Sequence, residues 1–251
     1  MSWCSFEEEV TAVVVGARGG IGEAFVQALT EATGVKHVFA LSRDATWCGE
    51  KSQGGSTRVQ VDITSEASLS GFVETLAEMN AQPNVIINCT GLLHRGDSKP
   101  ERRLSEIDGD FFRQVFDVNT VGVALLMKHL IPTMPRKSRA IFATLSARVG
   151  SISDNRLGGW YSYRASKAAQ NMLVKTAAIE SAHRFPKLVV VALHPGTVAT
   201  DLSDPFTKRL RPGHAVFPPE LSASHLTNVM EGLKPSDSGH FFAWDGAPIP
   251  W

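Results

Sequence analysis

The residue pair with the clearest chemical potential is Tyr163 and Lys167, which lie four residues apart within a predicted helix over 161–185. Side chains at that spacing share one face of a helix. A free phenol, with a pKa of about 10, is a poor base at neutral pH, but a nearby ammonium favours the phenolate and lowers that pKa. The pair could therefore exchange a proton with an oxygen that changes between carbonyl and alcohol. The alternative is an ordinary surface helix that carries one tyrosine and one lysine.

A glycine-rich turn joins a predicted strand at 11–15 to a predicted helix at 21–31. Gly16 permits a tight turn, Gly20 lets the backbone approach a pyrophosphate, and Gly22 lets helix and strand pack closely. The helix N-terminus then faces the anion. A flexible surface turn is the alternative, and the position of the glycines between strand and helix disfavours it.

Short apolar runs alternate with longer helical patterns along the whole chain, which predicts a mostly parallel sheet. We expect one domain over 1–251, an α/β doubly wound Rossmann-like fold with seven strands and helices on both faces. The expected strands are 11–15, 37–41, 57–61, 85–88, 139–145, 188–193 and 240–242, and the expected helices are 21–31, 66–79, 111–130, 161–185 and 221–231. Three long loops follow strands, at 92–108, 146–160 and 196–219. Ligands bind beyond the carboxyl ends of such strands, so these loops fall where a site is expected.

Composition argues against several other classes of protein. Lys plus Arg equals Asp plus Glu at 25 each, so no basic surplus favours a nucleic-acid or membrane partner. The sequence contains no run of about 18 apolar residues, so it predicts no membrane span. Glu7, Glu8 and Glu9 stand where a signal peptide needs positive charge. The three cysteines, odd in number and widely spaced, fit neither a disulfide framework nor a zinc site, and we expect a reducing cytoplasm.

The spacing of the turn, Gly-x-x-x-Gly-x-Gly, resembles that of the compact short-chain dehydrogenase/reductase family, with Val15 where that family often has threonine. More of the family pattern follows in order over nearly the whole chain. Its elements are Asp62, Asn88-Cys89-Thr90-Gly91, Asn119 in Asp-Val-Asn-Thr, Tyr163 and Lys167 in Tyr-Arg-Ala-Ser-Lys, and Pro195-Gly196. The stretch 150–155 and the Trp-Asp-Gly near the end resemble the C-factor and sniffer-type carbonyl reductase branch.

This resemblance implies an oxidoreductase that moves a hydride between a nicotinamide and a small carbonyl or alcohol substrate. Tyr163 would be the proton donor or acceptor, and Lys167 would lower its pKa and bind the nicotinamide ribose. Asn119 would hold a water that links Lys167 to solvent, although a hydrogen-bonded helix-bend residue is the alternative. The expected cofactor contacts are Gly16, Arg18, Gly20, Ile21, Gly22, Ser42, Arg43, Asp62, Ile63, Asn88, Gly91, Tyr163, Lys167, Pro195, Gly196, Val198 and Thr200.

A hydroxyl is also needed to hold the substrate oxygen, and the pattern offers several serines for this role. The family's serine usually lies three residues before a glycine, and Gly150 puts Ala147 in that position. Ser146, one residue earlier, is our choice after a small local shift. Ser151 and Ser153 are the rivals, and a strand-end cap is the structural alternative for Ser146.

The cofactor is expected to be NADP(H) rather than NAD(H). NAD-selective folds place a carboxylate about 20 residues after the glycine turn, and counting from Gly22 reaches Ser42, followed by Arg43. Two guanidinium groups suit a 2′-phosphate, and Arg18 points to the same place by resemblance to NADP-binding relatives. Asp44 is the complication, because a one-residue slip at the strand end would bring it toward the ribose and favour NAD.

Two further expectations concern partners. One expected helix is apolar around most of its circumference, which predicts a homo-oligomer, most simply a two-fold dimer; a neighbouring helix of the same chain is the alternative. Its apolar residues are Val118, Val121, Val123, Ala124, Leu125, Leu126 and Met127.

The substrate pocket is expected at Leu92, Leu93, His94, Trp160 and the loop 202–217. A different class of function, a cofactor-binding signalling or sensor protein of the C-factor type, remains the main rival.

Overall fold

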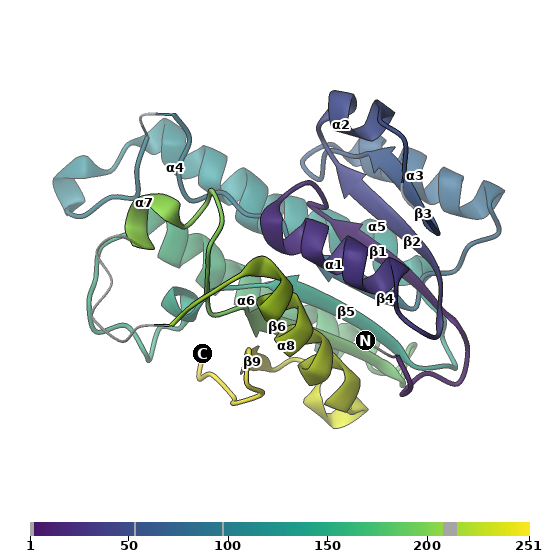
Figure 1. Cartoon of the computed structure of the whole chain (residues 1–251). Coiled ribbons are helices and arrows are strands. Elements are labelled where there is room, and N and C mark those ends of the chain that lie inside the picture. The colour runs from purple at the N-terminus through teal and green to yellow at the C-terminus, as the bar shows by residue number, and fades with distance from the viewer. Residues whose placement is uncertain (1–2, 53, 97, 208–214) are drawn as a thin grey trace.

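A computed structural model describes residues 3–52, 54–96, 98–207 and 215–251. Seven strands form one sheet in the order β3-β2-β1-β4-β5-β6-β9, and every pairing in it is parallel (Figure 1). The strands are β1 Val10–Val15, β2 Val35–Ser42, β3 Ser56–Gln60, β4 Val85–Asn88, β5 Ala140–Leu145, β6 Leu188–His194 and β9 Phe241–Ala243. The predicted doubly wound parallel fold is therefore confirmed, with each strand within two residues of its expected bounds.

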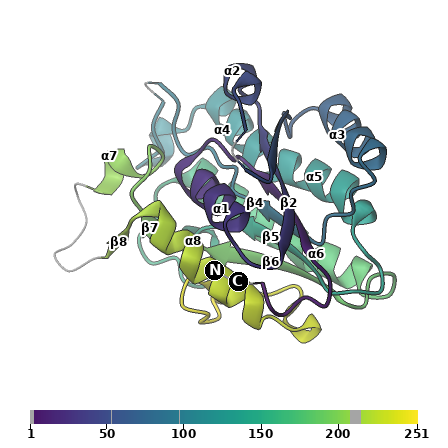
Figure 2. The same ribbon diagram turned by 45° about the vertical axis from the view of Figure 1, so that its right-hand side comes forward.

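Helices cover both faces of this sheet (Figure 2). They are α1 Gly20–Thr30, α2 Ala45–Gly49, α3 Glu66–Glu78, α4 Gly109–Phe116, α5 Gly122–Leu130, α6 Tyr161–Ser181, α7 Asp204–Thr207 and α8 Pro219–Gly232. Shorter turns of helix are η1 Leu104–Glu106, η2 Asp117–Val121, η3 Ile131–Thr133, η4 Arg148–Gly150 and η5 Pro235–Asp237. A small separate sheet pairs β7 Thr197–Val198 with β8 Val216–Phe217.

The core consists of two apolar layers, one on each face of the sheet. Successive strand residues point to opposite faces, so Val13 packs toward α3, α5 and α6 while Val14 packs toward α1 and α8. Strands covered on both faces need to be apolar throughout, and β1, β4 and β5 are buried along their whole length. This explains why continuous apolar runs, rather than alternating ones, predicted the strands.

The helix expected at 111–130 is interrupted. The π-helical turn η2 separates α4 from α5, and it carries Asn119, whose side chain bonds to atoms outside its own helix. By length and hydropathy the stretch Gly109–Thr133 is apolar enough to cross a membrane. Within it, Val123, Leu126 and Leu130 are fully buried in the core, and 39% of its most apolar window is buried inside the protein.

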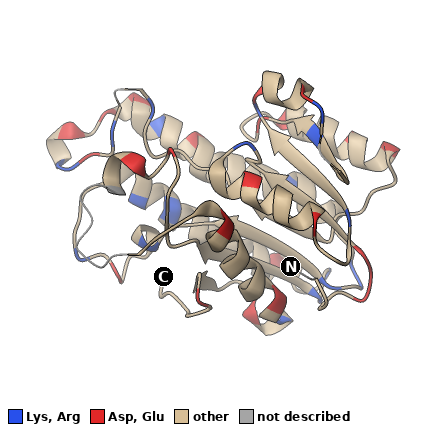
Figure 3. Ribbon diagram, in the orientation of Figure 1, with Lys and Arg blue, Asp and Glu red and all other residues tan. Residues whose placement is uncertain are grey.

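Three other differences from the expected helices are local. α6 ends at Ser181 rather than at 185, where the Ser181 hydroxyl bonds to the Ala177 carbonyl. α2 and α7 have only five and four residues, too short to show a hydrophobic period. Lys and Arg are interspersed with Asp and Glu along the ribbon (Figure 3), as expected from their equal numbers.

The apolar surplus on α5 is partly covered by the same chain, because Val123, Leu126 and Met127 are buried in the core. Val121 stays 47% exposed, and Met172 and Ile179 on α6 are 65% and 68% exposed. Met172 and Ile179 are seven residues apart and therefore lie on one face of α6. We propose that these side chains pack against a second copy of the chain.

We expect a homodimer with twice the 27.2 kDa mass of the chain in light scattering at micromolar concentration. Met172→Arg combined with Ile179→Glu should give a monomer, because a charge buried at an apolar interface is costly. Leu104→Glu, at an exposed position on η1, is the matched control and should remain a dimer. A monomeric mass for the parent protein would contradict the proposal.

Candidate active site

The glycine turn after β1 has the backbone that a bound pyrophosphate requires. Gly16 has a φ of +79°, and a Cβ on Gly22 would lie 2.2 Å from the Gly16 carbonyl oxygen. The N-cap of α1, Gly19, has no side chain that could bond the first amides of the helix. Those amides are left to a ligand, so the turn fits a dinucleotide phosphate group.

The loop after β6 closes over this turn. A Cβ on Gly20 would meet the Thr200 methyl at 3.0 Å, so Thr200 lies directly beside the turn. Gly196 has a φ of +80°, and a Cβ there would meet the Phe217 ring at 2.7 Å. Pro195 accepts a hydrogen bond from the Ser222 hydroxyl at 2.9 Å. Residues 180 positions apart in the chain thus form one edge of the candidate cofactor site.

Lys167 is buried at the end of β5, within a chain of hydrogen bonds. Its Nζ donates to the Leu145 carbonyl and to Gln170 Oε1, both at 2.8 Å. The Gln170 amide donates to Thr144 Oγ1 at 2.9 Å, and the Asn88 amide donates to the same hydroxyl oxygen at 3.0 Å. The predicted residues Asn88 and Lys167 are therefore connected through two residues that the sequence analysis missed. Gln170, a polar residue three positions after Lys167 on the same helix, was the available signal.

Asn119 ties the loop after β4 to α6. Its Oδ1 accepts from Leu92 N at 2.7 Å, and its Nδ2 donates to Leu92 O at 2.9 Å and to Ser166 Oγ at 3.0 Å. Ser166 in turn donates to the Tyr163 carbonyl at 2.9 Å. A Cβ on Gly91 would lie 3.8 Å from Asn119 Oδ1 and 3.9 Å from Lys167 Nζ. Asn119, Gly91 and Lys167 therefore meet at one point.

Burial controls the protonation of the central pair. It lowers the pKa of Lys167 to about 7 and raises the pKa of the Tyr163 phenol above its usual value. Lys167 Nζ lies 5.9 Å from the Tyr163 ring centroid. In the protein alone, burial thus opposes the lowering of the phenol pKa expected from the Lys167 charge. Tyr163 is protonated at neutral pH, which is the form that gives a proton to a new alkoxide.

Aromatic side chains lie beside Tyr163. The Trp160 ring is 6.1 Å from the Tyr163 ring and 5.0 Å from Phe206 on α7. The ring centroids of His94 and Phe206 are 5.9 Å apart, and His94 Nε2 lies 3.2 Å from the Asp201 carbonyl oxygen. Leu92 packs with Phe111 and Val115 in a small apolar cluster. Part of the expected pocket loop, 208–214, lies outside the described residues.

Charged groups gather beyond the end of β2. The strand ends at Ser42, one residue later than expected, so Arg43 is the first residue beyond it and Asp44 the second. Asp44 caps α2 through a hydrogen bond from Trp47 N and pairs with Arg18 at 2.6 Å. The Trp47 amide, and secondarily Arg18, hold the pKa of Asp44 below its usual value. The Arg43 side chain is exposed.

Two more of the expected cofactor contacts, Asp62 and Ile63, belong to the turn after β3. Asp62 Oδ1 accepts from Thr64 N at 2.9 Å and from the Thr64 hydroxyl at 2.7 Å. Ile63 is buried, and a Cβ on Gly122 would lie 2.8 Å from it. The structure therefore places all four predicted turns, after β1, β2, β3 and β4, at the same end of the sheet.

Comparison with known families gives a match between residues 10–211 and the short chain dehydrogenase family. The chain belongs to the short-chain dehydrogenase family. The 1-hydroxy-2-glutathionyl-2-methyl-3-butene dehydrogenase of Rhodococcus is 30% identical over 244 residues, 96% of this chain and 99% of that protein. The C-signal protein of Myxococcus xanthus is 32% identical over 148 residues, 59% of this chain and 83% of its own length.

Solved short-chain dehydrogenase structures have the same architecture. The NADPH-bound carbonyl reductase from chicken fatty liver superposes with a TM-score of 0.83 at 26% identity, covering 98% of this chain and 96% of that one. Together these relatives confirm the family predicted from the motifs and its C-factor-type branch, and they show that the chain is an oxidoreductase of this family.

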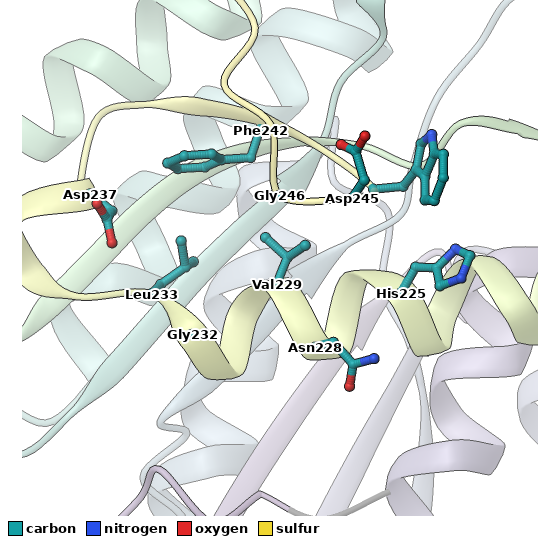
Figure 4. A pocket seen from close by; sticks show the side chains of 10 residues that line it. His225, Asn228, Val229, Gly232, Leu233, Asp237, Phe242, Asp245 and Gly246 are labelled. Atoms are coloured by element: carbon teal, nitrogen blue, oxygen red, sulfur yellow. The ribbon is translucent and has the colours of Figure 1, made fainter.

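A groove of about 480 Å³ lies elsewhere on this short-chain dehydrogenase, between α8 and the C-terminal segment (Figure 4). His225 and Val229 of α8 face Phe242 and Asp245 across it. Because α8 covers the face of the sheet opposite to α6, the groove does not include Tyr163 or Lys167.

The serine position departs from the usual short-chain dehydrogenase pattern. The Ser146 hydroxyl is buried and donates to Asn171 Oδ1 at 2.7 Å. Ser151 Oγ accepts from Asp154 N at 3.1 Å, and the Ser153 hydroxyl donates to the Trp251 carbonyl at 2.6 Å. Asn171 was not predicted. We propose that the Ser146 hydroxyl turns from Asn171 to the substrate oxygen.

Single Ser→Ala variants at positions 146, 151 and 153 test this assignment, with carbonyl turnover as the measurement. Ser146→Ala should lose activity by about tenfold or more, because a hydrogen bond to a developing alkoxide is lost. Ser151→Ala and Ser153→Ala should stay within about twofold of the parent. Ala147→Ser, at the usual position, is the fourth variant. If Ser146→Ala keeps the activity of the parent, and Ser151→Ala loses activity or Ala147→Ser gains it strongly, the substrate oxygen is bound at that other position.

Proposed function

We propose that this short-chain dehydrogenase is an NADP(H)-dependent oxidoreductase that interconverts a carbonyl and an alcohol, in the manner of a carbonyl reductase. The observation that carries the proposal is the buried pair of Tyr163 and Lys167 at the carboxyl end of the sheet. A protonated phenol stands near an amine whose hydrogen bonds fix its position. Reduction of a carbonyl requires such a proton donor beside the forming alkoxide.

Bound NADPH would supply the hydride from C4 of its nicotinamide. Tyr163 gives its proton to the substrate oxygen in reduction and takes it back in oxidation. Lys167, when protonated, stabilises the phenolate that forms and binds the nicotinamide ribose. Ser146 orients the substrate oxygen. Asn119 supports the return of a proton from solvent to Lys167.

Three residues support the choice of NADP(H). Arg18 in the glycine turn and Arg43 beyond β2 offer two guanidinium groups at the adenosine end, and Arg18 is 63% exposed. The carboxylate of Asp44, which would favour NAD if it bound the ribose, is engaged by Trp47 N and Arg18. The related chicken carbonyl reductase binds NADPH. A 2′-phosphate would compete with Asp44 for Arg18.

The substrate side supports a small carbonyl compound with an apolar or aromatic body. Trp160 and Phe206 provide ring surface beside Tyr163, and His94 is the nearby polar group. Basic and acidic residues are equal in number and interspersed along the chain, as expected for a protein whose partner is a small molecule rather than a nucleic acid or a membrane. We also propose that the protein works in a reducing cytoplasm, since its three cysteines are free.

The second candidate function is developmental signalling with incidental catalysis, which the similarity to the C-signal protein favours. A turnover assay with NADPH and a panel of aldehydes and ketones separates the two. Sustained turnover supports the reductase, and binding of cofactor with no turnover on any substrate supports the signalling protein.

Tyr163→Phe should cut carbonyl turnover by a factor on the order of 10² or more, because the ring remains but the proton donor is lost. The dissociation constant for NADPH, measured by fluorescence titration, should stay within about twofold of the parent. Tyr161→Phe, two residues earlier, is the matched control and should remain active. Wild-type turnover by Tyr163→Phe on every substrate of the parent would refute the assignment.

Arg43→Ala should raise the dissociation constant for NADPH roughly ten- to hundred-fold, because one charge-assisted contact contributes about 1.5–3 kcal/mol. Binding of NADH should change little, since NADH lacks the 2′-phosphate. Arg113→Ala, on an exposed turn of α4, is the control and should bind both cofactors like the parent. Equal affinity of the parent for NADH and NADPH, or equal weakening of both by Arg43→Ala, would overturn the NADP(H) assignment.

A further inference from the structure

Glu101 is a buried acidic residue that the proposed reaction does not use. It lies in the loop between β4 and α4 and is only 3% exposed. Its Oε2 accepts a hydrogen bond from Ser162 N at 3.2 Å, and its backbone carbonyl accepts from Trp160 N at 2.5 Å. One residue therefore contacts, through two different groups, the start of the helix that carries Tyr163.

The contact with Ser162 N caps α6 from a distant part of the chain. The N-cap residue of α6 is Trp160, which makes no side-chain cap hydrogen bond. The first amides of a helix need an acceptor, and a carboxylate there is also favoured by the helix dipole. Glu101 supplies this acceptor from 61 residues earlier in the sequence. The position of the first turn of α6 thus depends on the loop at 92–108.

The contact with Trp160 N fixes an unusual backbone. Trp160 has a φ of +53° and a ψ of 46°, a left-handed conformation that costs of order 1–3 kcal/mol for a residue other than glycine. Gly158 and Gly159, at φ of +64° and +65°, lead into it. A Cβ on Gly159 would lie 3.4 Å from the Glu101 carbonyl oxygen, so the two segments are in close contact.

This conformation places the Trp160 ring between the reacting residue and the loop after β6. The ring lies 6.1 Å from the Tyr163 ring and 5.0 Å from that of Phe206, at steep angles to both. Moving the Trp160 backbone out of the left-handed region would redirect this ring. The Glu101 carboxylate at Ser162 N and the backbone carbonyl at Trp160 N therefore both act on the segment that carries this ring and leads to Tyr163.

Stability alone is a poor explanation for this arrangement. Glu101 Oε1 and the Ser162 hydroxyl are buried with no hydrogen-bond partner among the described residues. A buried carboxylate oxygen without a partner costs free energy. An acidic residue at the N-cap itself would cap the helix more simply, as Asp108 caps α4 through Phe111 N at 2.7 Å. With Trp160 at the N-cap and the cap supplied by Glu101, the chain instead places an aromatic ring beside Tyr163.

We propose that Glu101 is a positioning residue, whose carboxylate closes the start of α6 at Ser162 N and thereby sets Tyr163 and the Trp160 ring against the substrate. The backbone carbonyl at the same position holds Trp160 N and brings the two segments together. The proposal rests on the proposed carbonyl reduction. It assigns a task to the segment before α4, which has no residue among the expected reacting groups.

The test compares Glu101→Ala, Glu101→Gln and the control Asp108→Ala. Glu101→Ala should lower kcat for carbonyl reduction by about tenfold or more, with the dissociation constant for NADPH within about twofold of the parent. Glu101→Gln keeps an acceptor oxygen of the same reach and should restore kcat to within about threefold of the parent. Asp108→Ala loses a cap of the same kind on α4 and should keep its kcat.

Amide hydrogen exchange supplies a second measurement that does not depend on turnover. Glu101→Ala should speed exchange at residues 161–164 relative to both the parent and Glu101→Gln, whereas Asp108→Ala should speed it only in α4. The Trp160 amide keeps its bond to the backbone carbonyl at position 101 in every variant. If Glu101→Ala does not fold, Glu101→Asp, one methylene shorter, takes its place with the same expected directions.

Parent-like kcat and exchange in the Ala or Asp variant would overturn the proposal, as would an equal loss of kcat in Asp108→Ala. These failures differ from failure of the proposed function. If Tyr163→Phe is inactive while Glu101→Ala retains full activity, the reductase assignment stands and the role of Glu101 does not. If the parent reduces no carbonyl, the reductase assignment fails, and the exchange measurement still decides whether Glu101 orders the start of α6.

Discussion

The buried amine of Lys167 is the constraint on which the rest of the site depends. An amine that leaves water must find acceptors, and Lys167 finds the Leu145 carbonyl at the end of β5 and the amide oxygen of Gln170. Gln170 and Asn88 then meet at the Thr144 hydroxyl. Two strands and one helix are thereby held in fixed register at the carboxyl edge of the sheet, where a parallel sheet leaves room for a ligand.

The same burial sets the chemistry of the pair. In the protein alone, the Lys167 amine has a pKa of about 7 and Tyr163 holds its proton. Burial disfavours the charged amine, and this effect leaves Lys167 near the midpoint of its titration at neutral pH. A group in that state can gain or lose a proton at little cost, which suits a residue beside a proton-transfer step.

Irregular backbone is concentrated around this edge. The π-helical turn η2 lets Asn119 reach the Leu92 backbone and Ser166, and the left-handed Trp160 directs its ring beside Tyr163. π-turns and left-handed residues other than glycine are unfavourable in isolation and are found where the surrounding structure compensates for them. Here the compensating contacts come from Leu92 and Glu101, both in the loop between β4 and α4. That loop therefore acts as a support for the site and is more than a connection.

The sequence by itself determined the order of the strands along the chain, the glycine turn, the spacing of Tyr163 and Lys167, and the family. These features depend on local periodicity and on residue types that only a few backbones accommodate, as with the glycines at 16 and 22. Only the tertiary structure decided the partners of the buried polar groups. Ser146 bonds to Asn171, Lys167 bonds to the Leu145 carbonyl, and Glu101 caps α6, and these contacts span 22 to 61 residues of the chain. A hydrogen bond of this kind is set by which side chains packing brings within about 3 Å, and no local pattern records that distance.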